Sequence, residues 1–240
     1  KTFAALGVYG TSVLTAVTAQ NTQGISAVHE IPDSIIADQI DSVISDIGTK
    51  AVKIGMLSNS NIIRTVVGKI KDLNLPNLVV DPVMVAKGGD RLLQEEAIDV
   101  LRTELLPLAL VATPNIPEAE ALTGIRILSL SDARLAAEKI IALGARNVVV
   151  KGGHLDGDAT DIFYDGTEFR EFSTSRIEST NTHGTGCTFA AAVAAGLAKE
   201  MSPVEAVAVA KEYVTQGIKF SFAIGRGYGP LNHFFEFWRA

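Results

Sequence analysis

Short apolar runs alternate along the chain with longer segments whose apolar residues recur every three or four positions. The runs cover residues 12–19, 51–54, 78–80, 110–112 and 147–150, and the periodic segments cover residues 33–47, 61–73, 92–106, 117–122 and 132–143. Nearly continuous apolar runs are typical of strands buried on both faces, and a 3.6-residue period is typical of helices. The alternation predicts an α/β fold with a doubly wound, mostly parallel sheet and helices on both faces.

The ends of the periodic segments carry residues that often begin or end helices. Asp33, Ser60 and Ser131 are predicted N-caps, because their side chains can accept hydrogen bonds from the first free amides of a helix. Gly48 and Gly144 are predicted to end helices, since glycine adopts the left-handed conformation of a C-terminal cap. Residues 1–6 resemble the last turns of a helix that stops at Gly7.

Two parts of the chain depart from the alternation. Residues 25–31 follow the turn sequence Asn-Thr-Gln-Gly as a possible strand, and residues 161–164 and 168–172 flank Asp165-Gly166 as a small β-hairpin. Residues 189–198 and 203–223 are predicted helices. Without repeats, linkers or low-complexity segments, residues 1–240 are predicted to form one domain.

The stretch from Asn181 to Thr188 places two glycines directly before an alanine-rich helix. The unpaired amides of a helix start, together with the helix dipole, can hold a phosphate or a developing oxyanion, and the same field would favour a thiolate at Cys187. The alternative is an ordinary helix start that is capped by Thr182 or Thr185, with Cys187 as a small buried residue.

Polar or contact-forming residues follow the predicted strands. They are Gln20, Met56, Asp81, Asn115 and Lys151. Ligands of doubly wound sheets collect beyond the carboxyl ends of the strands, so these residues are expected to converge on one edge.

Each of these positions also has an ordinary structural explanation. Asp81 before Pro82 suits a turn, and Asn115 with Glu118 three residues later suits a helix capping box. In combination, however, Asp81 and Glu118 could hold Mg²⁺ beside Lys151 and the amide-lined helix start. This combination predicts a phosphoryl-transfer site.

Composition and charge exclude several other classes of protein. A formal net charge of −6 argues against nucleic-acid and anionic-membrane partners, and one cysteine cannot form an intrachain disulfide. No secretory signal is evident, so a cytoplasmic location is expected.

The phosphate-binding motif of P-loop enzymes is absent. A nucleophilic pair of Cys187 and His183 remains a distant alternative, because the two residues need not face each other across the turn.

Six segments together resemble one known family. They are residues 181–188 (NTHGTGCT), 151–154 (KGGH), 81–84 (DPVM), 113–118 (TPNIPE), 53–56 (KIGM) and 227–230 (GYGP). In order and spacing they are similar to the bacterial hydroxymethylpyrimidine and hydroxymethylpyrimidine-phosphate kinases of thiamin biosynthesis, within the ribokinase superfamily. The resemblance implies a ribokinase-like fold and two successive ATP-dependent phosphorylations of 4-amino-5-hydroxymethyl-2-methylpyrimidine.

The resemblance also implies roles for individual residues. Gln20, Met56 and Val83 would contact the pyrimidine; the amide and thioether groups of the first two suit an aminopyrimidine edge and a ring face. Catalysis would involve Cys187 and the anion hole, and the nucleotide, phosphates and Mg²⁺ would be held by further polar residues. The anion hole would consist of Gly184, Thr185 and Gly186. The nucleotide and its phosphates would be bound by Asn115, Lys151, Thr182 and His183. Asp81 and Glu118 would lie near the metal.

Two departures from the family pattern bear on the expectation. Family members begin with a strand and a glycine-rich segment before the residues that match Lys1, and this chain lacks them. Relatives in the wider superfamily carry Asp where this chain has Cys187, whereas cysteine is typical of the pyrimidine branch and of some vitamin B6 kinases. Pyridoxal kinase and a catalytically impaired ligand-binding fragment are therefore the alternatives, and a homodimer is expected from the family.

Overall fold

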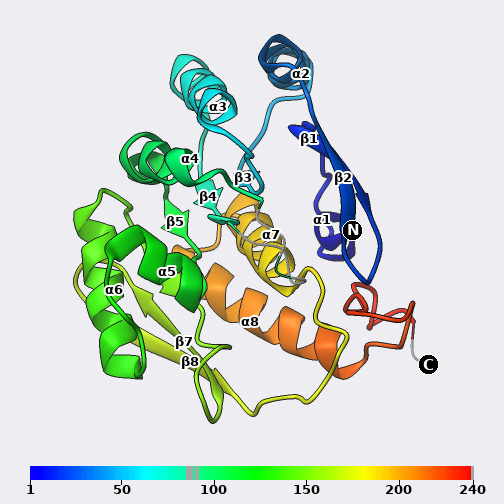
Figure 1. The fold of residues 1–240 in the computed structure, drawn as a ribbon, viewed down its shortest axis with the longest axis vertical. Helices are drawn as coiled ribbons and strands as arrows, with labels where there is room; N and C mark the ends of the chain where they lie inside the picture. The colour runs from blue at the N-terminus through cyan, green and yellow to red at the C-terminus, as the bar shows by residue number, and fades with distance from the viewer. Residues whose placement is uncertain (85–88, 90–91, 239–240) are drawn as a thin grey trace.

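The computed structural model describes residues 1–84, 89 and 92–238 and has a six-stranded sheet at its centre (Figure 1). The strand order follows the sequence. The strands are β3 (Val52–Ile54), β4 (Leu78–Val80), β5 (Val111–Ala112), β6 (Val148–Val150), β7 (Ala159–Tyr164) and β8 (Phe169–Thr174). The first four pair in parallel, and β7 and β8 continue the sheet as an antiparallel hairpin. The predicted sheet and hairpin are confirmed.

Both faces of the sheet are buried, as the apolar runs predict. Successive side chains of a strand point to opposite faces, so Val79, Val111 and Val149 enter one hydrophobic core while Val80 and Val148 enter the other. All five side chains are inaccessible to solvent. This burial on two sides explains why the runs are apolar at nearly every position.

Helices cover the two faces in two groups. One core contains α2 (Asp33–Asp46), α3 (Ser60–Asp72), α4 (Glu95–Val100), α5 (Ile116–Thr123) and α6 (Leu130–Ala142). The other contains α1 (Thr2–Ala5), α7 (Thr185–Ala198) and α8 (Pro203–Lys219). Because parallel crossovers are right-handed and the strand order advances in one direction, the crossover helices share one face. Helices from the two ends of the chain cover the other face, without a reversal of strand order.

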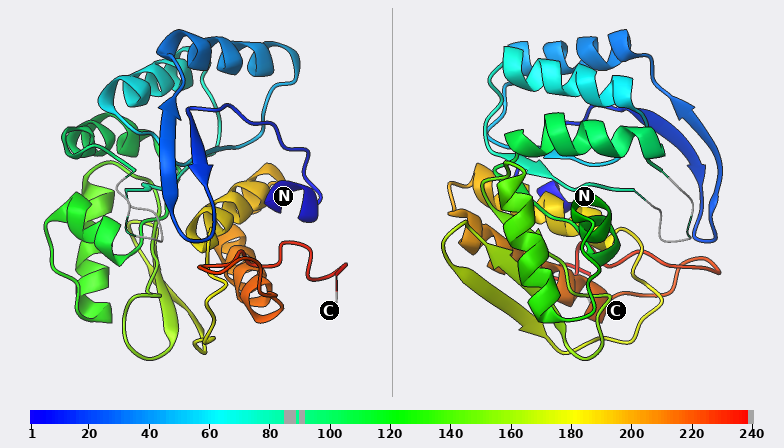
Figure 2. Two further views of the ribbon diagram at one scale, coloured as in Figure 1. Left: turned by 45° about the vertical axis from the view of Figure 1, so that its right-hand side comes forward. Right: turned by 60° about the vertical axis from the view of Figure 1, so that its left-hand side comes forward.

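The first apolar run forms a strand outside the main sheet, which corrects the prediction for residues 12–19. Strand β1 (Ala16–Gln20) pairs only with β2 (Ile25–Glu30), in an antiparallel hairpin that stands apart from the six-stranded sheet (Figure 2). Most of its residues are at least partly exposed. A short run interrupted by Thr15 and Thr18 does not distinguish a buried strand from a strand of an exposed hairpin. The predicted strand at residues 25–31 is confirmed.

The predicted N-caps are wrong by one or two residues. Asn59 caps α3 and Ser129 caps α6, while Asp33 lies in the first turn of α2 after Pro32. In each helix a neighbouring residue adopts the extended conformation of a cap, which sequence position alone does not fix. Gly48 and Gly144 have the positive φ expected at helix ends, +73° and +112°.

Two predicted helices differ in extent. The helix expected over residues 92–106 begins at Glu95, and it continues beyond α4 as a π-helical turn (Leu101–Leu105) and a 3₁₀ turn (Leu106–Leu108). Helix α8 ends at Lys219 instead of residue 223. Among the described residues, no helix combines the length and apolar character needed to cross a membrane.

Small residues bring α7 and α8 close together under the sheet. A Cβ atom on Gly196 of α7 would lie 2.8 Å from the Cβ atom of Ala206 on α8, so a larger side chain would force the helices apart. Ala192, Ala194 and Ala210 are also buried in this layer. The start of α7 therefore projects from a tightly packed base.

Candidate active site

The carboxyl ends of the parallel strands bring several of the predicted residues together. Asp81 follows β4, Asn115 follows β5 and Lys151 follows β6. Asn115 and Lys151 form an isolated parallel bridge, and Nζ of Lys151 lies 3.1 Å from Oδ1 of Asp81. The predicted convergence at this edge of the sheet is confirmed for these three residues.

Asp81 is almost completely buried, with 2% of its surface exposed, and lies between two lysines. Its Oδ1 accepts a hydrogen bond from Lys151, and its Oδ2 lies 3.5 Å from Nζ of Lys53. Burial alone would raise the pKa of this carboxyl, but the charges of Lys151 and Lys53 outweigh that effect and hold the pKa below its usual value. Asp81 is therefore a carboxylate, and its Oδ2 has no hydrogen-bond partner within the described part of the chain.

Lys53 is a further member of this cluster, which the sequence alone did not identify as a site residue. It is the middle residue of β3, where a lysine interrupts an otherwise apolar run. Its side chain runs back over Gly55, where a Cβ atom would lie 2.5 Å from Nζ. A lysine within a buried strand needs a partner for its charge, and that requirement was the signal that could have identified it.

Asn115 and Glu118 form a complete capping box at the start of α5. The Asn115 side chain accepts the Glu118 amide at 2.9 Å, and Glu118 Oε2 accepts the Asn115 amide at 2.8 Å. The capping alternative is thus confirmed. Glu118 is also more buried than is usual for a capping residue, and desolvation raises its pKa to about 7. The positive charge of Lys151 opposes this rise, and the negative charge of Asp81 adds to it. Glu118 therefore shares the electrostatic environment of the lysine and Asp81.

Helix α7 begins at Gly184, a glycine in the left-handed conformation, and neither threonine caps it. Gly184 has φ 78°, and no side chain accepts a hydrogen bond at this helix start. Thr185 instead donates its hydroxyl to the carbonyl of Thr182 at 2.7 Å. The expectation of a Thr182 or Thr185 side-chain cap is wrong. The Thr185 amide donates to the Thr182 carbonyl at 3.3 Å, so the amides of its neighbours Gly184 and Gly186 are the ones left for a ligand. A Cβ atom on Gly186 would lie 3.1 Å from Nζ of Lys151, so the lysine reaches this helix start.

Cys187 lies in the first turn of α7 with an exposed side chain. The protein atoms around the sulfur still desolvate it and raise the pKa of the thiol, and Lys53 and Lys151 oppose this effect only in part. The expected preference for thiolate is therefore wrong for this structure. The negative charge of Asp81 raises the pKa of the thiol further. The alternative of a Cys187 and His183 nucleophilic pair stays a prediction.

The three residues expected to contact a pyrimidine lie on different segments. Gln20 ends β1 and its side chain is exposed, Met56 follows β3, and Val83 lies two residues beyond Asp81; the last two are half-buried. The Met56 carbonyl accepts the hydroxyl of Thr15 at 2.9 Å, which ties the strand end to the segment before β1. Their role in binding a pyrimidine stays a prediction.

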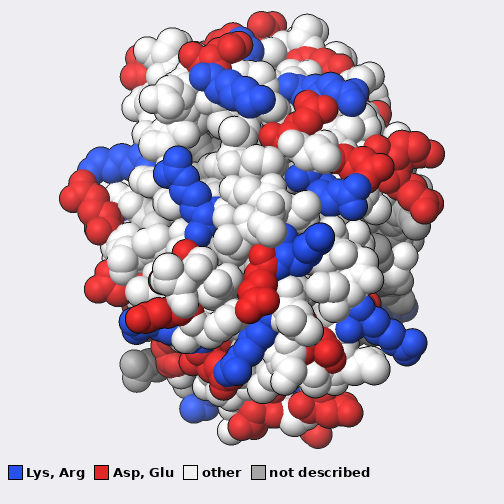
Figure 3. All heavy atoms as spheres, turned by 90° about the vertical axis from the view of Figure 1, so that its left-hand side faces the viewer, with Lys and Arg blue, Asp and Glu red and all other residues white. Residues whose placement is uncertain are grey.

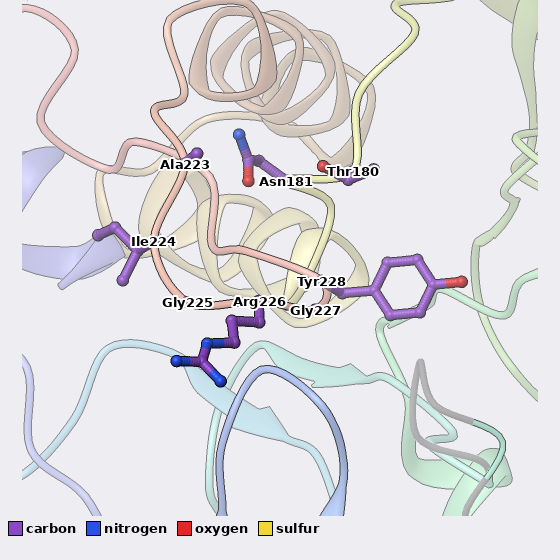
Figure 4. Close-up of a pocket in the computed structure, with 8 residues that line it drawn as sticks. All are labelled: Thr180, Asn181, Ala223, Ile224, Gly225, Arg226, Gly227 and Tyr228. Atoms are coloured by element: carbon purple, nitrogen blue, oxygen red, sulfur yellow. The ribbon is translucent and has the colours of Figure 1, made fainter.

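A pocket of about 390 Å³ adjoins the start of α7 (Figure 4). Thr180 and Asn181 line one side, and the loop of residues 223–228 lines the other. The amide of His183 donates to the Gly229 carbonyl at 2.9 Å, so this loop is joined to the glycine-rich turn. The pocket lies beside the helix start and is distinct from the Asp81 cluster.

The donor groups limit which metal the site could hold. Among the residues that the structure describes, no group of three or more His, Cys, Asp or Glu side chains could ligate a metal. Asp81 and Glu118 interact electrostatically, and Asp81 Oδ2, although 3.5 Å from Nζ of Lys53, accepts no hydrogen bond from the described residues. Mg²⁺ commonly takes one or two carboxylates and completes its shell with water and substrate phosphates, so this pair fits Mg²⁺.

Surface charge is mixed on one face of the molecule. Acidic and basic side chains are intermingled on the face shown in Figure 3. That the chain has no nucleic-acid partner stays a prediction.

Comparisons with known proteins give a consistent result. The family model for phosphomethylpyrimidine kinase matches residues 1–232. The hydroxymethylpyrimidine/phosphomethylpyrimidine kinase of Rhizobium meliloti is 49% identical, with coverage of 100% of this chain and 91% of that protein. The thiamine biosynthesis bifunctional protein of Geobacter sulfurreducens is 51% identical, with coverage of 97% of this chain and 48% of that protein, so the chain spans about half the length of this relative.

Solved structures confirm the predicted ribokinase-like fold. A Bacillus subtilis pyridoxal kinase, solved as an ADP complex, superposes with a TM-score of 0.90 at 40% identity, over 97% of this chain and 89% of that one. A phosphomethylpyrimidine kinase from Clostridium difficile has a TM-score of 0.81 at 45% identity, over 90% of each chain. On sequence and fold together, the chain belongs to the phosphomethylpyrimidine kinase family.

Proposed function

We propose that this chain is an ATP-dependent kinase that phosphorylates 4-amino-5-hydroxymethyl-2-methylpyrimidine and then its monophosphate, in thiamin biosynthesis. One observation carries the proposal: Asp81, Lys151, Glu118 and Cys187 share one electrostatic cluster at the start of α7, in a chain of this family. Phosphoryl transfer needs positive charge and free amides around the moving group, and the cluster offers both.

The phosphates of ATP are assigned to the start of α7 and the residues around it. The amides of Gly184, Thr185 and Gly186 form the anion hole, and Lys151 places a positive charge beside it. Thr182 and His183 lie in the turn before the helix, next to the pocket of residues 180–181 and 223–228, which is placed to receive the nucleoside. Complexes of related pyridoxal kinases with ADP and AMP-PCP support nucleotide binding.

Mg²⁺ is assigned to the carboxylates of Asp81 and Glu118, with Asn115 beside them. When bound, Mg²⁺ would neutralise phosphate charge as the transferred group moves. The buried Oδ2 of Asp81, which accepts no hydrogen bond from the described residues, and the raised pKa of Glu118 are both features that a nearby cation would relieve. Asn115 keeps Glu118 in place through the capping box.

The pyrimidine is assigned to Gln20, Met56 and Val83. The Gln20 amide can donate to a ring nitrogen and accept from the exocyclic amine, and Met56 can pack against the ring. Cys187 is assigned to the acceptor oxygen, with the carboxylate of Asp81 beside it. In the first phosphorylation the hydroxyl must lose a proton, and Cys187 and Asp81 are the groups assigned to carry it away.

Pyridoxal kinase is the second candidate, because pyridoxal kinases superpose on this chain with TM-scores of 0.89 and 0.90. Release of ADP should be measured with hydroxymethylpyrimidine, with its monophosphate, with pyridoxal and without acceptor. The proposal predicts turnover with the two pyrimidines well above that with pyridoxal. Turnover with pyridoxal alone would favour the second candidate, and binding of ATP without turnover of any acceptor would indicate a ligand-binding fragment.

We further propose that residues 1–240 act as one domain, that the chain forms a homodimer and that it works in the cytoplasm. One sheet shared by both hydrophobic cores supports the single domain. Exposed Val17 and Val28 on the β1–β2 hairpin offer apolar surface for a second copy. Light scattering of the natural chain and of Val17→Asp tests the dimer: a monomeric natural chain would contradict it.

A further inference from the structure

A buried ion pair joins α8 to the main sheet outside the cluster described above. Nζ of Lys211 donates to Asp161 Oδ2 at 2.9 Å and to the Ala159 carbonyl at 2.6 Å. Both side chains of the pair are buried, and Asp161 belongs to β7, which is antiparallel to β6. The lysine and the carboxylate thus neutralise each other inside the protein.

The second oxygen of Asp161 leads to the active-site cluster. Oδ1 accepts the backbone amide of Gly152 at 3.0 Å, and Gly152 directly follows Lys151. A Cβ atom on Gly152 would overlap with the carbonyl oxygen of Thr160, so the main chain runs against β7 at this point. On its other side, the Lys151 amide donates to the Pro114 carbonyl at 2.9 Å. The backbone that carries Lys151 is therefore held from both sides.

Stability alone gives no strong reason for such a pair. Removing two charges from water costs several kcal/mol for each ion, and apolar residues of similar volume often stabilise a fold as well or better. A carboxylate does supply what an apolar residue lacks, which is a fixed, charged acceptor for one particular amide. Here the amide belongs to the residue next to Lys151.

We propose that Asp161 and Lys211 are positioning residues for Lys151: Lys211 orients Asp161, and Asp161 fixes the backbone from which Lys151 reaches Asp81 and the start of α7. The inference rests on the proposed function, because it concerns the lysine assigned to the transferred phosphoryl group. Lys151 needs this support because its ammonium group must lie between Asp81 and the amides near Gly186. Neither Asp161 nor Lys211 touches the substrate.

The first test replaces Lys211 with Met and compares steady-state constants for ATP. We expect kcat to fall about tenfold or more, since a shift of about 1 Å near reacting atoms can reduce rates by about 100-fold. KM for ATP should change less than about threefold, because an interaction made mainly in the transition state affects kcat more than binding. Calorimetric titration with the non-hydrolysable analogue AMP-PCP checks the binding separately.

Val207→Ala is the matched control. Val207 is fully buried, one helical turn before Lys211 on α8, and its truncation leaves the ion pair intact. The control should lower the melting temperature with little change in kcat. If it slowed turnover as much as Lys211→Met, general loosening of α8 would explain both results and the proposal would be wrong.

A crystal structure of Lys211→Met distinguishes failure of the inference from failure of the proposed function. Positioning predicts that the separation of Lys151 Nζ and Asp81 Oδ1, now 3.1 Å, grows beyond hydrogen-bond range. An unchanged separation would overturn the inference even if kcat fell. A longer separation with unchanged kcat would support positioning and contradict the role of Lys151 in phosphoryl transfer.

Two further variants keep the test decisive if Lys211→Met does not fold. The double variant Asp161→Leu with Lys211→Met removes both charges and should fold, yet it should lose turnover to the same degree. Lys211→Arg keeps a cation opposite Asp161 and should recover most of the lost turnover. A folded double variant with kcat within about twofold of the natural chain and an unchanged separation of Lys151 Nζ and Asp81 Oδ1 would overturn the proposal.

Discussion

Lys151 and Asp81, 70 positions apart in the sequence, form a hydrogen-bonded ion pair of 3.1 Å at the carboxyl ends of β6 and β4. Desolvation lowers the pKa of Lys151, but the carboxylates of Asp81 and Glu118 outweigh it and raise the pKa above its ordinary value. Both partners are thus charged at neutral pH. The pair holds one positive charge beside the anion-binding helix start and one negative charge beside Cys187.

Asp81→Asn should destabilise the protein by about 3 kcal/mol or more, because it leaves two largely buried lysines without their carboxylate. Activity should also be lost. The control is Asp41→Asn, which breaks the more exposed pair with Lys69 and should cost about 1 kcal/mol or less. Unfolding in denaturant measures the free energy of unfolding of both variants. If Asp81→Asn lost as little stability as Asp41→Asn, the two buried lysines would not depend on the Asp81 carboxylate.

Glu118 should make the stability of the ligand-free protein depend on pH. Its folded pKa of about 7 lies above the 4.5 of an unperturbed glutamate side chain. Below pH 4.5 both states are protonated; as pH rises from about 4.5 to about 7, the unfolded state ionises first, so stability falls, by up to about 3 kcal/mol. In Glu118→Gln this loss should be absent. Unfolding free energies at pH 5 and pH 7 decide the point, and parallel curves for both proteins would contradict it.

The same variant tests the role of Glu118 in metal binding. If Glu118 serves Mg²⁺ in addition to capping α5, then Glu118→Gln should shift the Mg²⁺ dependence of turnover to higher concentrations. Gln can still accept the Asn115 amide, so the cap itself survives. An unchanged Mg²⁺ dependence would leave capping as the only role of this residue.

Gln20→Leu should weaken pyrimidine binding by about 1 to 3 kcal/mol, because it leaves a buried polar edge of the ligand unpaired. Binding of AMP-PCP should be unaffected. Gln23→Leu is the matched control, since Gln23 is an equally exposed glutamine on the turn of the same hairpin. Equal losses for both ligands in Gln20→Leu would show that the hairpin affects the site only indirectly.

Cys187 should matter differently in the two phosphorylations. Cys187→Ala should slow phosphorylation of the alcohol much more than that of the monophosphate, because the monophosphate is already anionic and needs no base. Cys187→Asp should impair mainly the second step, since a fixed carboxylate repels the incoming phosphate. Steady-state rates of both variants with the alcohol and with the monophosphate test this prediction. Equal effects on the two steps would mean that residue 187 only shapes the anion hole.

Gly152→Ala should lower stability by about 3 kcal/mol, or about 6 to 12 °C in melting temperature for a chain of this size. The added Cβ atom would overlap with the Thr160 carbonyl. Gly153→Ala is the control: no atom lies within 4 Å of its added Cβ, and melting should be almost unchanged. Similar melting of the two variants would show that β7 can move away from this turn.

The sequence predicted which residues lie at the carboxyl edge of the sheet better than it predicted where the helices begin. Asp81, Asn115 and Lys151 could be placed because strand ends follow from buried apolar runs, and parallel strands bring their ends together. Helix caps were misplaced by a few residues, since several neighbouring polar residues can serve as a cap and tertiary contacts choose among them.

The electrostatic state of the site could not be inferred in the same way. A helix start favours a thiolate, but the state of Cys187 depends on how desolvation and Asp81 balance Lys53 and Lys151, groups that are distant in sequence. The first apolar run was misassigned because its environment, an exposed hairpin, is decided by contacts far along the chain. Both errors concern long-range neighbours, which local patterns do not encode.

The contact of Thr22 with the loop of residues 225–228 sets an order of events during synthesis. The Thr22 hydroxyl accepts the Gly227 amide 205 positions later, and its carbonyl accepts the Tyr228 amide. At about 5 to 20 residues per second, the hairpin turn leaves the ribosome roughly 10 to 40 s before its partner. The six-stranded sheet and the helices α1 to α8 are synthesised before the loop that joins Thr22 to the turn of His183. The nascent chain thus acquires its framework first and the closed rim of its active site afterwards.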